Sequence, residues 1–250
     1  MIVKFENIEL HNFKQPWSLY PYANFLHYGL TRKIFSVFKI NKAVFTKYSD
    51  SIQLCDEKLE KSDVPELLNF CKTSKIKMIC GPSKQLSYIL IYMKNKEIHK
   101  GCILEIGECE KVEPNFKKAL KESEFRSIAD LVCEVNLKEN PNYYQPEEYF
   151  HQIYNRFIEK YTNSYYATDG NQIIASLSTY AETNDYAVIG GLVVKEDYRK
   201  KHIGSSLFKN VVNHLINNNK KVFLFCYNKE IYKFYKKYAN KEFQYSKMYL

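Results

Sequence analysis

The sequence lacks the features of an exported or membrane-bound protein. No uncharged apolar stretch approaches the roughly 20 residues that a helix needs to cross a bilayer. At the N-terminus, Glu6 and Glu9 interrupt the apolar residues, which argues against the basic-then-apolar form of a secretory signal. We therefore expect a soluble, cytoplasmic protein without a membrane partner.

Paired metal-ligand motifs are missing as well. The seven cysteines form no C-x-x-C pair, and the six histidines show neither H-E-x-x-H nor a Cys/His spacing suited to zinc. An odd number of scattered cysteines is typical of reduced thiols inside a cell. We predict no structural metal.

Positive charge is present in excess. Lysine and arginine total 37 against 28 acidic residues, which gives a net charge of +9. Such a balance favours a polyanionic partner, which could be nucleic acid, an acidic surface or a phosphate-bearing cofactor. The lysines are spread along the whole chain, as on a generally solvated basic surface, so we expect no nucleic-acid partner.

The length and composition predict two folded domains. The 250 residues are 45% hydrophobic and 26% charged, the balance of a globular protein. A polar stretch around Pro114 separates two segments that each carry strand and helix signals. We predict a smaller mixed α/β domain at 1–112 and a second domain at 115–250, both of the α/β class. In the first, helices are expected at 62–73 and 83–94 and strands at 76–80 and 102–106.

The second segment has a regular order of elements. Its periodicity predicts helices at 125–136, 146–161, 202–217 and 229–238, and strands at 164–169, 172–181, 186–194, 221–227 and 242–250. Asp169 and Gly170 are expected to turn a hairpin between the first two strands. The order of these elements implies a mixed sheet with helices packed on it.

A basic loop follows the apolar run "AVIGGLVV". The stretch "YRKKHIGS" places Arg199, Lys200 and Lys201 between this strand and a helix, where unpaired backbone N–H groups can meet an anion. The loop matches neither G-x-x-x-x-G-K-[ST] nor G-x-G-x-x-G, so it does not indicate a nucleoside triphosphate or a dinucleotide. Coenzyme A is the remaining common carrier of a pyrophosphate.

Here the sequence resembles the GNAT (GCN5-related) N-acetyltransferases. Their acetyl-CoA loop has Arg or Gln, two residues, Gly, one residue, and Gly or Ala; this chain has Arg199, His202 and Gly204 at those positions. The departure is His202, where the family usually has its first glycine. The resemblance covers residues 117–250 and implies a GNAT fold, preceded by a domain that in one subgroup is a degenerate copy of the same fold.

The resemblance also implies cofactor-binding residues. They are the strand backbone and the loop: Leu192, Val193, Val194, Arg199, Lys200, Lys201, His202, Ile203, Gly204 and Ser205. Asn228 falls at the position of the family's cofactor-binding asparagine; a turn-forming asparagine is the alternative.

Acetyl transfer needs an acid for the departing thiolate and a route for the proton of the amine. Tyr235 lies where the family places its thiolate-protonating tyrosine, although packing on an apolar helix face is the alternative. Glu182, in the turn before the third strand, is the candidate general base; a solvated turn residue is the alternative. His151 can line the acceptor site or lie on the surface, and Cys226 is expected to be a core thiol and no nucleophile.

We therefore expect an acetyl-CoA-dependent N-acetyltransferase that acts on a primary amine, with a small-molecule acceptor, by direct attack in a ternary complex. A non-catalytic acyl-CoA-binding or regulatory module is a second hypothesis. A basic nucleic-acid-binding protein is a third, and it predicts affinity that falls steeply with salt.

Overall fold

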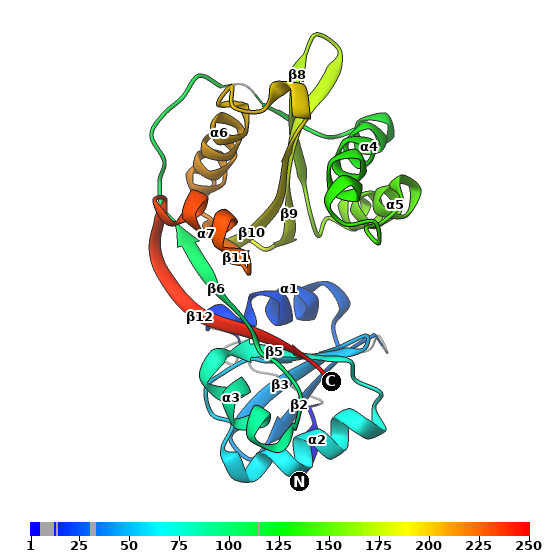
Figure 1. Ribbon diagram of the computed structural model, residues 1–250, viewed down its shortest axis with the longest axis vertical. Helices are drawn as coiled ribbons and strands as arrows, with labels where there is room; N and C mark the ends of the chain where they lie inside the picture. Colours follow the sequence, from blue (N-terminus) through cyan, green and yellow to red (C-terminus); the bar gives the residue numbers. More distant parts are fainter. Residues whose placement is uncertain (6–12, 14, 31–33, 115) are drawn as a thin grey trace. The chain divides into compact units, whose positions relative to one another are not determined.

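A computed structural model describes the chain apart from residues 6–12, 14, 31–33 and 115. Glu6 and Glu9, on which the expectation of no secretory signal was based, lie outside the described residues. The chain divides into two compact units (Figure 1). Unit 1 comprises Met1–Leu104, Phe225–Lys237 and Lys241–Leu250, and unit 2 comprises Glu105–Leu224 and Tyr238–Asn240.

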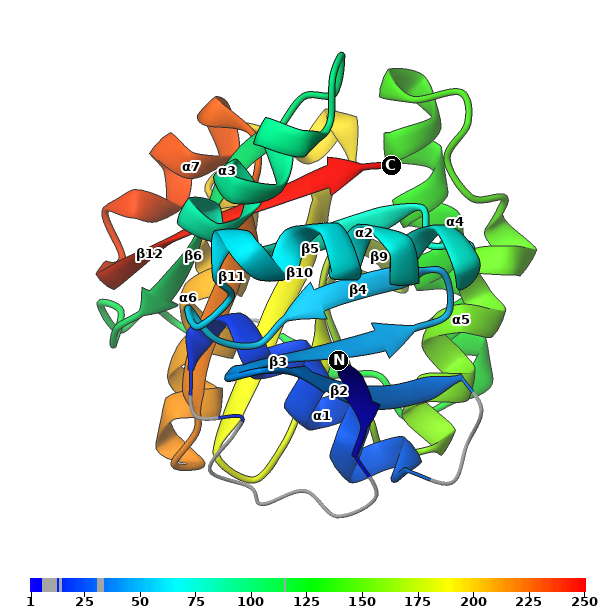
Figure 2. The same ribbon diagram turned by 90° about the horizontal axis from the view of Figure 1, so that it is seen from below.

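Unit 1 is built on a mixed sheet. Its neighbouring strands run in the order β1, β2, β3, β4, β5, β12, and all pairs are antiparallel except β4 with β5 (Figure 2). The strands in this order are β1 (Ile2–Lys4), β2 (Phe35–Ile40), β3 (Ala43–Tyr48), β4 (Ser51–Leu54), β5 (Met78–Pro82) and β12 (Ala239–Tyr249). Strand β6 (His99–Ile106) belongs to unit 1 up to Leu104, and β12 belongs to it from Lys241. The α-helices are α1 (Leu19–Tyr28), α2 (Val64–Thr73), α3 (Ser83–Tyr92) and α7 (Lys229–Lys236).

Strand β2 has buried side chains on both faces of this sheet. Phe35 and Val37 join the cluster that includes Tyr22 and Phe25 of α1, whereas Ile40 joins the larger core with α2 and α3. Successive strand residues point to opposite faces, so a strand with apolar residues on both sides is held by helices on both sides.

Unit 2 carries a second mixed sheet. Its strands are β7 (Lys117–Lys118), β8 (Ser164–Asp169), β9 (Gln172–Glu182), β10 (Tyr186–Val194) and β11 (Lys221–Cys226), in the order β7, β8, β9, β10, β11. All pairs are antiparallel except β10 with β11. Its α-helices are α4 (Glu122–Glu139), α5 (Pro146–Ile158) and α6 (Ile203–Asn217). Helices α4 and α5 cover one face of this sheet and α6 covers the other (Figure 1).

The helices of unit 2 follow the predicted apolar spacing. Phe125, Ile128 and Val132 of α4 are buried on the face that packs on the sheet. Leu207, Val211 and Leu215 do the same for α6. The hairpin of β8 and β9 turns at Asp169 and Gly170 as predicted, with Gly170 at φ +55°.

The mixed α/β class is confirmed, but the compact units are not the two predicted ranges. Residues 225–237 and 241–250 group with the N-terminal residues because β12 pairs with β5 from Tyr245–Pro82 to Tyr249–Met78. A long-range strand pairing of this kind leaves no local signal in the sequence. The ranges 1–112 and 115–250 remain a prediction about the family domains.

Among the described residues, no helix is both long enough and apolar enough to cross a membrane.

Candidate functional site

Strand β10 is irregular just before the basic loop. Its register with β9 shifts between the Gly190–Ser178 and Val193–Ser176 pairs, so β10 has one extra residue there, and Gly191 has φ +63°. Such a β-bulge commonly includes a glycine with positive φ. The bulge changes the direction in which the following backbone groups point.

The last residues of β10 run past its ladder with β11. That ladder extends from Tyr186–Lys221 to Ile189–Leu224, whereas β10 continues to Val194. The N–H of Lys195 donates to the carbonyl of Ile174 on the β9 side, so by strand alternation the groups of Val194 point away from β9. This is the strand geometry expected for Leu192, Val193 and Val194, although their role in cofactor binding remains a prediction.

The loop after β10 contains two residues in the left-handed region. Lys200 has φ 61°, and His202 has φ 60° and ψ 6°. Only glycine adopts this region without a steric cost, which explains physically why a glycine suits position 202. Histidine is among the residues that tolerate it best. The His202 side chain is exposed to solvent.

Helix α6 starts directly after this turn. Its N-cap residue, His202, makes no side-chain capping bond, while the His202 carbonyl accepts from the Ser206 N–H and from Ser205 Oγ at 2.9 Å each. The N–H groups of Ile203, Gly204 and Ser205 therefore form the open first turn of a 15-residue helix. The helix dipole adds a partial positive charge at this end, so the turn suits an anion.

The basic side chains of the loop have different surroundings. Arg199 Nε donates to the Val194 carbonyl at 3.3 Å, so Arg199 folds back onto the end of β10. Lys201 Nζ lies 5.0 Å from the ring centre of Tyr198. Tyr198 in turn donates to Asp169 at 2.7 Å, a hydrogen bond that raises the pKa of Tyr198. Lys200 and Lys201 are exposed, and both add positive charge beside the α6 N-terminus.

Gly204 is required for packing. A Cβ atom at this position would lie 2.9 Å from Cγ2 of Val194 and 3.9 Å from Cδ2 of Leu192. A separation under 3.0 Å forces a shift, so a larger residue would move the start of α6 away from β10. Gly204 is therefore needed for the contact between α6 and β10, and its role in cofactor binding remains a prediction.

Glu182 is held in a network of hydrogen bonds. Its carboxylate accepts from Asn163 Nδ2 at 2.6 Å, from Thr179 Oγ1 at 3.0 Å and from Lys220 Nζ at 2.8 Å. The side chains of Glu182 and Lys220 are only 12% and 18% exposed. The turn residue is therefore not solvated as the alternative supposed. Its role as a base remains a prediction, and the ion pair with Lys220 counts against it.

Asn228 and Tyr235 lie on or beside α7, in unit 1. Asn228 is the N-cap of α7, and its Oδ1 accepts from the N–H groups of Glu230 at 2.7 Å and Ile231 at 3.4 Å. Both lone pairs of that oxygen are used, so a cofactor contact has to come from Nδ2. Tyr235 is 6% exposed and makes an edge-to-face contact with Phe234 at 4.8 Å. The loop lies in unit 2, so the cofactor roles of both residues remain predictions.

The two other candidates from the sequence, His151 and Cys226, both lie in surroundings that fit a structural role. His151 Nε2 pairs with Glu147 at 3.1 Å on the exposed side of α5. Cys226 is 2% exposed, and a hydrogen bond with Cys102, together with burial, raises its pKa. A thiol with a raised pKa is a poor nucleophile, which agrees with the prediction of a core cysteine.

Sequence reasoning missed a pair of tyrosines at the bulge. A Cβ on Gly190 would lie 2.5 Å from Cε2 of Tyr180, and a Cβ on Gly191 would lie 2.5 Å from Oη of Tyr180 and 3.8 Å from Oη of Tyr149. Two adjacent glycines inside an apolar strand were the available signal, since glycine in a strand often marks a bulge or a close approach.

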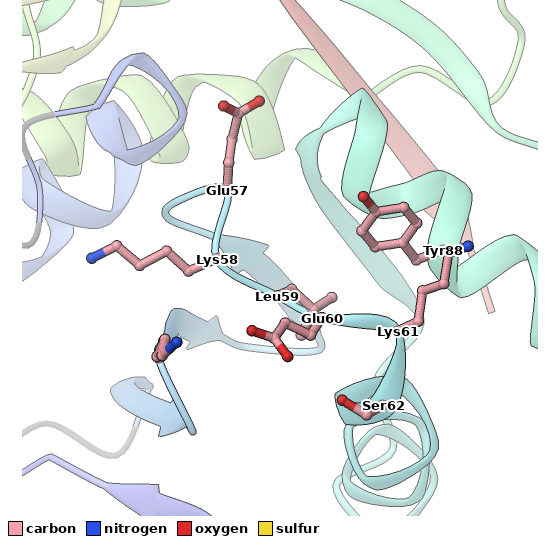
Figure 3. Close-up of a pocket in the computed structure, with 8 residues that line it drawn as sticks. Glu57, Lys58, Leu59, Glu60, Lys61, Ser62 and Tyr88 are labelled. Carbon is pink, nitrogen blue, oxygen red and sulfur yellow. The ribbon is translucent and has the colours of Figure 1, made fainter.

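A pocket of about 580 Å³ lies in unit 1, around the loop that leads into α2 (Figure 3). Its wall has charges of both signs: Glu57 and Lys58 point in different directions, and Lys61 Nζ lies 5.6 Å from the ring centre of Tyr88. A wall with mixed, exposed charges selects neither an anion nor a cation. We therefore regard the loop before α6 as the better candidate.

The comparisons with known proteins agree with this choice. Residues 129–239, which include β10, the loop and α6, match the model of the acetyltransferase (GNAT) family. No curated protein matches the chain.

Three solved structures share the fold. An acetyltransferase of the GNAT family from Colwellia psychrerythraea is 10% identical, with 100% of both chains covered and a TM-score of 0.60. A GCN5-related N-acetyltransferase from Kribbella flavida is 9% identical, covering 94% of this chain and 96% of its own, with a TM-score of 0.59. A conserved protein of unknown function from Bacteroides thetaiotaomicron is 11% identical over 100% of both chains, with a TM-score of 0.56. The chain therefore carries, at residues 129–239, a domain that is similar to the acetyltransferase (GNAT) family.

Proposed function

We propose that the protein is an acetyl-CoA-dependent N-acetyltransferase that acts on the primary amine of a small molecule. The amine attacks the thioester directly while both substrates are bound. We further propose that the reaction takes place in the cytoplasm, a compartment in which seven unpaired cysteines persist.

The observation that carries the proposal is the uncapped start of α6 inside the family-matched residues. Three backbone N–H groups, the helix dipole and two exposed lysines converge on one short loop. This donor set fits a pyrophosphate, which carries two negative charges and many acceptor oxygens. Backbone N–H groups of 203–205 would bind the phosphate oxygens, and Lys200 and Lys201 would offset their charge.

The end of β10 would hold the rest of the cofactor. The residues from Leu192 to Val194 run past the ladder with β11, so their backbone groups on that side can bond to the amides of pantetheine. A backbone N–H at the thioester carbonyl would stabilise the negative charge that develops on its oxygen. Acetyl-CoA supplies the activated acyl group, and the chain positions it.

Two side chains would act on the leaving group and the cofactor. Tyr235 would donate its phenolic proton to the departing thiolate. Asn228 would contact the cofactor through Nδ2. Because Glu182 is paired with Lys220, the proton of the amine would leave through water rather than to that carboxylate.

Calorimetry with acetyl-CoA, followed by a thiol-release assay over a panel of amines, tests the proposal. We expect binding, and release of coenzyme A with at least one amine. Gly204→Val should weaken binding at least tenfold, because it displaces N–H groups whose charge-assisted hydrogen bonds contribute about 1.5–3 kcal/mol each. Ser205→Ala is the matched control, since it removes a hydroxyl that bonds to His202 and keeps the N–H.

Absence of acetyl-CoA binding by the unaltered chain would refute the proposal. An unchanged dissociation constant in Gly204→Val would refute the loop assignment. Binding without thiol release on any amine would instead fit the non-catalytic acyl-CoA-binding module.

A further inference from the structure

Four tyrosines of unit 2 form a cluster at the β10 bulge. The tyrosine cluster consists of Tyr143, Tyr144, Tyr149 and Tyr180. The hydroxyls of Tyr180 and Tyr149 approach Gly191, at 2.5 Å and 3.8 Å from where a Cβ atom would stand. This is the residue directly before Leu192, where the segment proposed to hold the thioester begins.

The cluster extends from the interior to solvent. The ring centres of Tyr143 and Tyr149 lie 6.1 Å apart, those of Tyr144 and Tyr149 lie 6.4 Å apart, and those of Tyr143 and Tyr144 lie 5.4 Å apart. Tyr149 is 4% exposed, whereas Tyr144, in the connection between α4 and α5, is 46% exposed. Aromatic faces are thus available at the surface beside two buried hydroxyls.

The chemistry of the cluster is neutral and aromatic. Burial raises the pKa of Tyr143, Tyr149 and Tyr180, so their hydroxyls stay protonated near neutral pH. The positive charge of Arg156 offsets part of the rise in the pKa of Tyr180 that burial causes. A cationic neighbour opposes each positive charge on an acceptor, so its effect is smallest for an acceptor with one amine, and neutral rings offer stacking rather than an ion pair.

On the basis of the proposed transferase function, we propose that the tyrosine cluster binds the acceptor and that the acceptor is a monoamine that carries an aromatic ring. The exposed ring of Tyr144 stacks on the ring of the acceptor, and the Tyr180 hydroxyl lies next to its amine at the bulge. Two rings that stack contribute about 0.5–1.5 kcal/mol beyond their buried area.

Direct binding tests the inference without requiring turnover. The probes are 2-phenylethylamine and 2-cyclohexylethylamine, which share a carbon skeleton and differ in aromaticity. Their binding to the full chain in the presence of coenzyme A is measured by ligand-observed NMR. Tyr144→Ala should weaken the binding of 2-phenylethylamine about threefold to tenfold, which follows from the stacking energy above. The same substitution should change the dissociation constant of 2-cyclohexylethylamine less than twofold. Tyr249→Ala is the control, because Tyr249 is 49% exposed in unit 1 and should change neither.

A preference for phenylethylamine that Tyr144→Ala removes and Tyr249→Ala keeps would support the inference. Equal binding of the two amines, a preference that survives Tyr144→Ala, or no amine signal at millimolar concentration would overturn it. Calorimetry with acetyl-CoA on the same samples separates the two proposals: if acetyl-CoA binds while the amine result is negative, only the aromatic acceptor is refuted.

Discussion

Replacing His202 with glycine should stabilise the protein. At φ 60° an L-residue has a steric cost of roughly 1–2 kcal/mol, and glycine has none. Glycine lowers the stability of the folded state by roughly 0.5–1 kcal/mol, because its unfolded chain has greater conformational freedom. The expected net gain is therefore about 1 kcal/mol. For a chain of this length that corresponds to a rise in Tm of about 2–4 °C.

Two neighbouring residues serve as controls, because they are exposed in the same loop. Lys200 has φ 61°, so Lys200→Gly should also raise the Tm, whereas Lys201 does not have a positive φ, and Lys201→Gly should lower it. Differential scanning calorimetry gives the three values. Since His202→Gly keeps every backbone N–H of the α6 start, the dissociation constant for acetyl-CoA should be equal or lower.

If His202→Gly lowers the Tm as much as Lys201→Gly does, the left-handed turn does not exist in solution. A large loss of acetyl-CoA affinity would mean instead that the imidazole of His202 contacts a phosphate of the cofactor.

Three further substitutions test other parts of the structure. Glu182→Gln leaves the amino group of Lys220 without its carboxylate and should lower the free energy of unfolding by about 2 kcal/mol, or the Tm by about 4–8 °C. The kcat at 25 °C should stay within twofold, and a large loss of kcat without a change in Tm would make Glu182 the base. Tyr235→Phe should lower kcat in the thiol-release assay more than it changes the affinity for acetyl-CoA, and equal activity would remove its acid role. Burial lowers the pKa of His214, so stability should fall as pH decreases below the unfolded value of about 6.5 and level off below the folded one. His214→Gln should flatten the dependence of Tm on pH between about pH 7.5 and about pH 5.5, roughly one pH unit either side of that unfolded value. A slope equal to that of the unaltered chain would contradict this.

The part of the site that is local in sequence could be predicted. The apolar run of β10, the basic loop and the apolar face of α6 follow one another along the chain, so periodicity and charge located them. The left-handed conformation of Lys200 could not be read in the same way, because lysine carries no preference for it.

Interactions between distant residues were out of reach. The ion pair of Glu182 and Lys220 joins residues 38 positions apart, and neither position has a local signal for the other. The approach of Tyr180 to the glycine pair depends on the register of β9 with β10, which the bulge shifts. The hairpin strands β2, β3 and β4 were not predicted either. Asn41 and Ser49, which have φ 48° and 54° in the turns between them, are of residue types that are common in turns, and this was a usable signal.

The pairing of β12 with β5 has a consequence for synthesis of the protein. Tyr249 is the partner of Met78, so the first sheet lacks one of its strands until synthesis has reached β12, more than 150 residues after β5. The edge of β5 is exposed for that time, and unpaired strand edges are sites of aggregation. Expression of the N-terminal half alone should therefore give insoluble material, which the C-terminal strand, supplied as a separate peptide, would partly rescue.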